Sequence, residues 1–161
     1  MIEVEIEDEA WTAAVDGVRV IVNATARAAL RAAAPAIQAT QADVVVLLAN
    51  DATLEDLNQR FRGKAGPTNV LSFPAPDAAR PHLGDIAIAY GVCAREAREQ
   101  NKTLKHHLMH LVAHGVLHLV GYDHQTESEA EEMEALERRV LDGLGAPDPY
   151  RTAATDGPHA G

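Results

Sequence analysis

The most informative stretch of the chain covers residues 103–124 and reads TLKHHLMHLVAHGVLHLVGYDH. Thr103 can cap a helix and Gly121 can end one, so the stretch predicts a helix from Leu104 to Val120 followed by a tight turn. Six of the protein's eight histidines fall within it. This density is unusual for one helix and its turn, and it directs attention to metal binding.

Three of these histidines are spaced to meet at one ion. His114 and His118 are four residues apart, which puts them on the same helix face with Cβ atoms about 5–6 Å apart. Gly121 can adopt a positive φ, and the two residues after it are enough to bring His124 back toward the pair. Three protein ligands leave a position for water, as in catalytic rather than structural sites. Because imidazole ligands suit zinc best, we expect about one zinc ion per chain.

The spacing of these ligands is also that of the metzincin motif H-E-x-x-H-x-x-G-x-x-H. The second position of the motif holds the glutamate that serves as general base in those peptidases, and this chain has Gly115 there. The pattern therefore predicts a metal-dependent hydrolase and argues against a peptidase.

Two neighbouring residues have open roles. His110 lies one turn earlier on the same face, about 6 Å along the helix axis. We expect it to support a ligand or contact substrate rather than bind the ion. Asp123 can orient water or a histidine N–H, or it can cap the helix end. For His82, His106, His107 and His159 we expect a place at the edge of the core.

The remaining sequence predicts one α+β domain, with about four strands in a mixed sheet and about five helices. The expected strands cover residues 2–6, 42–49, 68–73 and 83–89, and the expected helices cover residues 11–34, 51–61, 92–100, 104–120 and 128–144. The strand order cannot be read from the pattern. We expect the domain to span residues 1–147 and a Pro- and Gly-rich tail, residues 148–161, to be disordered.

Charge and hydropathy exclude several classes of protein. The net charge of −10 argues against coating nucleic acid by bulk electrostatics, although the segment between Gln59 and His110 is basic. The strongest apolar run, residues 44–49, is too short to cross a bilayer, and the N-terminus has no secretory signal. We therefore expect a cytoplasmic protein without a membrane partner. The single cysteine, Cys93, cannot form an internal disulfide.

Several motifs together resemble the YbeY family of bacterial endoribonucleases. The histidine segment is similar to the family signature, and so are two earlier segments. These segments are Leu57-Asn58-x-x-Phe61-Arg62-x-Lys64 continuing into residues 67–74, and Leu83-Gly84-Asp85-Ile86. The motifs occur in the family's order and spacing over roughly residues 45–140. One departure from the family pattern bears on the strength of RNA contacts. Family members commonly have Lys-Asp-Lys-Pro where this chain has Lys64-Ala65-Gly66-Pro67, so a charged pair is lost.

The resemblance implies a single-strand-specific, metal-dependent endoribonuclease. Such an enzyme would act in maturation of the 16S rRNA 3′ end and in ribosome quality control. Its expected partners are single-stranded RNA and the ribosome or small-subunit assembly factors, and DNA is not expected to bind. The family's metal ligands correspond to His114, His118 and His124, and its functional arginine to Arg62, the candidate catalytic residue. Two alternatives remain: a metallopeptidase-like hydrolase, and a non-catalytic assembly factor with a structural metal.

Overall fold

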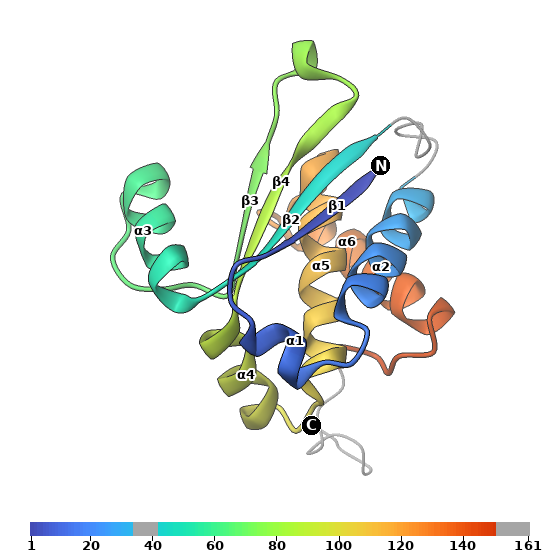
Figure 1. The fold of residues 1–161 in the computed structure, drawn as a ribbon. Helices are drawn as coiled ribbons and strands as arrows, with labels where there is room; N and C mark the ends of the chain where they lie inside the picture. The colour runs from blue at the N-terminus through green and yellow to red at the C-terminus, as the bar shows by residue number, and fades with distance from the viewer. Residues whose placement is uncertain (34–41, 151–161) are drawn as a thin grey trace.

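The centre of the fold is a four-stranded mixed sheet. In the computed structural model, which describes residues 1–33 and 42–150, the strands are β1 (Ile2–Ile6), β2 (Asp43–Ala49), β3 (Val70–Pro74) and β4 (His82–Ala89). Their order is β1-β2-β4-β3 (Figure 1). Strands β1, β2 and β4 run parallel, whereas β3 pairs antiparallel with β4 and forms one edge of the sheet. The predicted α+β class and mixed sheet are confirmed.

The helices lie unequally on the two faces of this sheet. They are α1 (Ala10–Ala14), α2 (Val18–Ala32), α3 (Asp51–Arg62), α4 (Tyr90–Glu99), α5 (Leu104–Val120) and α6 (Glu127–Gly143). Val44, Val46 and Ile86 point into a core shared with α2 and α5. Leu47 and Ala87 point to the opposite face, where they pack with Leu54 of α3. In Figure 1, α2, α5 and α6 stand together on one side of the sheet and α3 stands apart from them.

One predicted helix is divided in two. The expectation of a continuous helix from residue 11 was wrong, because Val15 is extended and Gly17 is left-handed at φ 65° between α1 and α2. A left-handed residue cannot continue a right-handed helix, and glycine adopts this conformation with little strain. This break gives the described residues one α-helix more than expected. The predicted end of that helix, at residue 34, lies outside the described residues.

The predicted ends of α5 are confirmed. The Thr103 hydroxyl accepts a hydrogen bond from the His106 backbone N–H at 3.1 Å, and Gly121 ends the helix with φ 120°. Helix α6 begins at a capping box in which Thr126 and Glu129 each accept the other's backbone N–H. Both ends are set by local hydrogen bonds, so the turn between the helices has a defined path.

Contacts with the domain extend to Pro149 and Tyr150, inside the tail expected at residues 148–161. Ala146 is buried beside Met109 and Leu141, and Lys102 donates from Nζ to the carbonyl of Pro149 at 2.8 Å. Residues 151–161, the rest of that expected tail, lie outside the described part of the chain. None of the helices within residues 1–33 and 42–150 has the length and apolar character needed to cross a membrane.

Candidate metal centre

Three imidazole rings stand in a triangle at the C-terminal end of α5. The ring centroids are 6.1 Å apart for His114 and His118, 5.7 Å for His114 and His124, and 6.0 Å for His118 and His124. The helix supplies two rings because residues four apart share a face. The turn at Gly121 supplies the third. The structure thus brings together all three histidines that the sequence singled out.

The two helical histidines have one ring nitrogen already occupied. His114 Nδ1 lies 2.7 Å from Glu137 Oε2, and His118 Nδ1 lies 2.9 Å from the backbone carbonyl of Tyr122. Because these partners accept hydrogen bonds, each Nδ1 carries a proton, and in the neutral ring Nε2 keeps its lone pair. Metal-binding histidines in proteins are held in the same way.

Glu137 is a fully buried carboxylate on α6, with 0% relative exposure. Its Oε2 accepts from His114, while Oε1 accepts from His110 Nε2 at 2.8 Å and from the Tyr150 hydroxyl. Burial by itself raises the pKa of Glu137, but the hydrogen bonds from His110, His114 and Tyr150 outweigh it and lower the pKa to about 2. The carboxylate is therefore ionised and has a donor on each oxygen.

The histidine triangle fits a zinc-like ion in its donor chemistry. Three imidazoles without a thiolate match a catalytic zinc site with one open position. Within the described residues, no group of three or more His, Cys, Asp or Glu side chains is close enough to enclose an ion as it stands. Binding therefore requires the rings to turn toward one another. His124 can do so most easily, because its side chain is 57% exposed and lies on the turn.

Gly115 faces the sheet and not the histidine triangle. A Cβ atom at this position would lie 3.0 Å from Cδ1 and 3.1 Å from Cγ2 of Ile86 on β4. The residue is buried, so a glutamate side chain here would be forced into the core. The absence of the metzincin base thus has a packing reason: α5 lies too close to β4 to carry a side chain as long as glutamate at residue 115 without displacing Ile86.

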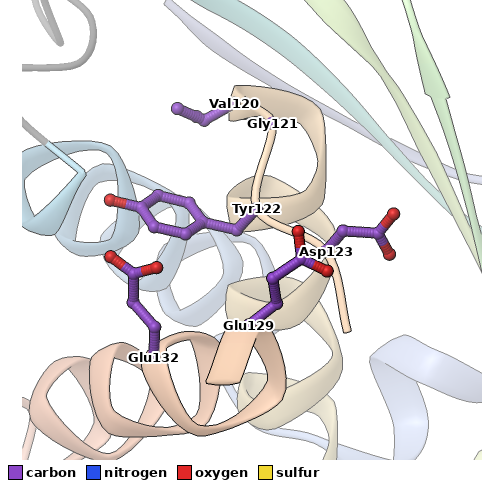
Figure 2. A pocket seen from close by; sticks show the side chains of 6 residues that line it. All are labelled: Val120, Gly121, Tyr122, Asp123, Glu129 and Glu132. Carbon is purple, nitrogen blue, oxygen red and sulfur yellow. The ribbon is translucent and has the colours of Figure 1, made fainter. Parts of the chain in front are cut away.

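A hollow with an acidic lining lies beside the turn (Figure 2). It is formed by Val120, Gly121, Tyr122, Asp123, Glu129 and Glu132. Asp123 Oδ1 accepts the backbone N–H of His124 at 2.7 Å, which places this carboxylate in the turn that carries the third histidine. The negative charge here favours a nearby cation and disfavours phosphate on this side.

Arg62 lies at the end of α3 and contacts the edge strand. Its Nη2 donates to the carbonyl of Ser72 at 2.9 Å, and its guanidinium carbon lies 6.0 Å from the ring centroid of Phe73. Ser72 itself is buried on the face of β3 that packs toward α5. Strand β3 therefore lies between Arg62 and the helix that carries the histidines, and the structure does not bring Arg62 into contact with them.

Other titratable groups near α5 have structural roles. His107 Nε2 bonds Glu96 Oε1 at 2.9 Å and so joins α5 to α4; burial lowers its pKa. The Cys93 thiol is buried, which raises its pKa from 9.0 to about 12. His107 is buried, as expected for a position at the edge of the core.

Two residues of the site were missed from the sequence, Glu137 and Tyr150. A signal for Glu137 was present, since it lies on the buried stripe of α6 with Met133, Leu136, Val140 and Leu141. A carboxylate on an apolar stripe needs a partner. Tyr150 gave no such signal, because it lies in the segment expected to be disordered.

An α+β domain with three histidines on one helix and its turn is the arrangement expected of a metal-dependent hydrolase. The family model described as endoribonuclease YbeY matches residues 5–145. The chain belongs to the YbeY family.

Individual relatives agree with the family model. A protein named endoribonuclease YbeY from Rhodopseudomonas palustris is 51% identical over 156 residues, covering 92% of this chain and 80% of the relative. One of the same name from Maricaulis maris is 45% identical over 160 residues, covering 99% and 98%. The solution structure of TM1509 from Thermotoga maritima is similar, with a TM-score of 0.56 and 25% identity over 94% of this chain and 99% of that one.

Proposed function

We propose that the protein cuts single-stranded RNA with one zinc ion held by His114, His118 and His124, and that it does so on ribosomal RNA at the ribosome or with small-subunit assembly factors. Membership of the YbeY family makes it a metal-dependent endoribonuclease in rRNA maturation. The identity of the metal, the residues that hold it and the ribosomal partners are the proposed parts.

The observation that carries the zinc proposal is the arrangement of ring nitrogens. His114 and His118 each have Nδ1 bonded to an oxygen acceptor, which leaves Nε2 for an ion. His124 stands about equally far from both rings. When bound, zinc would act as a Lewis acid and lower the pKa of a water molecule toward about 7. A separate protein base at residue 115 is then unnecessary.

The protein's own residues would bind and orient the RNA. The acidic hollow beside Asp123 disfavours phosphate, so the sugar-phosphate backbone of the RNA would approach the histidines from another side. Arg62 is the candidate cation for that approach. Its bond to Ser72 occupies part of the guanidinium and leaves other N–H donors to take a phosphate oxygen. This role requires RNA to pass the open edge of β3.

The two alternative functions are weakened to different degrees. A metallopeptidase would need a base near the ion, and the packing of Gly115 against Ile86 disfavours a glutamate at the metzincin position. A non-catalytic assembly factor would keep the metal only to join α5 and α6. RNA cleavage by purified protein separates this second alternative from the proposal.

The test combines metal analysis and RNA cleavage on the same tag-free sample. We expect about one zinc per chain, cutting of an unstructured labelled RNA, and loss of both in a His114→Ala, His118→Ala double mutant. Unchanged metal content in the double mutant would refute the ligand assignment. Ribosome binding without cutting in any metal form would favour the assembly factor, and cleavage of casein would favour the peptidase.

A further inference from the structure

A chain of contacts leads from the end of the described residues to a proposed metal ligand. It starts at Tyr150, whose hydroxyl donates to Oε1 of Glu137. The other oxygen of Glu137 holds His114 Nδ1 at 2.7 Å. Tyr150 is 36 residues beyond His114 in the sequence, yet one carboxylate separates the two side chains.

Hydrogen bonds and ring contacts hold the segment that carries Tyr150 against the domain. Asp148 Oδ1 accepts the Tyr150 backbone N–H at 2.8 Å and also pairs with Arg138 of α6. The guanidinium of Arg138 lies over the Tyr150 ring, 5.1 Å from its centroid. The ring also meets His110 edge-on at 5.1 Å. These contacts hold the hydroxyl in the direction of the buried carboxylate.

Glu137 can hold His114 in only one useful orientation. Both of its oxygens are occupied by donors, so the carboxylate has little freedom to rotate away. As an acceptor, it requires the proton of His114 on Nδ1. That tautomer leaves the Nε2 lone pair free, and the rings of His118 and His124 lie 6.1 and 5.7 Å away between centroids.

We propose that Glu137, braced by Tyr150, is the positioning residue of the metal centre, so that residues 146–150 belong functionally to a site to which they contribute no ligand. The inference rests on the proposed assignment of His114, His118 and His124 to a metal. Without the brace, Glu137 has one donor fewer on Oε1, and the His114 ring is less strictly oriented. Ion affinity is then lower although all three ligands remain.

The experiment measures zinc affinity by competition with a chromophoric chelator in Glu137→Gln, Tyr150→Phe and the control Glu131→Gln. Glu131 is exposed on the same helix, so its change removes the same charge without touching the site. We expect about 10- to 100-fold weaker zinc binding in Glu137→Gln, the range typical for partners of ligand histidines. Tyr150→Phe should weaken binding by a few-fold, and the control should match the wild type.

A second readout is the tautomer of His114 in the metal-free protein, from the ring ¹⁵N shifts in NMR spectra. Wild type and control should show the proton on Nδ1, and Glu137→Gln should show a mixture. Zinc affinity and tautomer of Glu137→Gln equal to those of the control would overturn the inference. If that variant fails to fold, Tyr150→Phe decides, and wild-type affinity there overturns the brace.

Failure of the underlying assignment gives a different pattern. If His114→Ala binds zinc as tightly as the wild type, the ligand assignment itself is wrong, whatever Glu137 does. If His114→Ala loses zinc while Glu137→Gln and Tyr150→Phe keep it, the ligands stand and only the positioning role falls.

Discussion

The contact between Gly115 and Ile86 sets the distance of the histidine helix from the sheet, and Gly115→Ala tests this directly. The new Cβ would lie 3.0, 3.1 and 3.3 Å from three carbons of Ile86, closer than nine in ten real contacts of this kind. Ile86 has no exposed surface and cannot move into solvent. Helix α5 and strand β4 must therefore separate by a few tenths of an ångström.

Two effects of known size compete in this variant. Replacing glycine by alanine inside a helix contributes about 0.8–1.0 kcal/mol of stability. Overpacking of a core costs about 1–3 kcal/mol. The expected net change is a loss of about 0–2 kcal/mol, and each kcal/mol lowers Tm by about 2–4 °C in a domain of this size.

A second substitution isolates the packing effect. Ile86→Val alone should cost about 0.5–1.5 kcal/mol, because it removes one buried methyl group. In the Gly115→Ala background it also removes Cδ1, the nearest atom to the new Cβ. The double mutant should therefore be more stable than the sum of the single effects predicts, with a coupling of at least about 0.5 kcal/mol.

The assay is urea unfolding of the wild type, Gly115→Ala, Ile86→Val and the double mutant, with zinc affinity measured in parallel. Gly143→Ala in α6 is the control, since no atom lies within 4 Å of a Cβ there. That variant should be as stable as the wild type or slightly more stable. Gly115→Ala should bind zinc more weakly, because His114 lies next to the displaced position. A Gly115→Ala variant more stable than the wild type, or strictly additive effects with Ile86→Val, would refute the packing argument.

Three further predictions concern RNA, Arg62 and Cys93. A labelled single strand should be cut in preference to its annealed duplex, because a net charge of −10 gives little grip on a duplex; equal cutting would contradict this. Arg62→Ala should lower the single-turnover cleavage rate about 10²-fold and should keep the metal. Its free energy of unfolding should fall by only about 0.5–1.5 kcal/mol, from the lost hydrogen bond to Ser72. Arg62→Lys should recover part of the rate, and weaker RNA binding at an unchanged rate would make Arg62 a docking residue. Cys93 should resist alkylation at pH 8 until the protein is unfolded, because burial raises its pKa to about 12; the stability tied to this thiol is lost as pH rises above 9.0, where the unfolded chain ionises first.

Local sequence determined much of the candidate site. The four-residue spacing of His114 and His118, the cap at Thr103 and the reversal at Gly121 all act within one or two helical turns. Their geometry depends on backbone hydrogen bonds and on glycine's freedom at positive φ, and both follow from residue type and spacing. The same local rules predicted the strands and most helix ends. They failed between Val15 and Gly17, where a single left-handed residue interrupts an otherwise helical pattern.

Only the tertiary structure decided how distant segments serve these histidines. The order β1-β2-β4-β3 places β3 at an edge of the sheet, where the Ser72 carbonyl accepts a hydrogen bond from Arg62. Glu137 and Tyr150 reach the His114 ring from α6 and from the residues after it. No spacing rule relates these positions. A buried carboxylate requires a hydrogen-bond donor of some kind, and the packing of α5 against α6 determines which side chain that donor is.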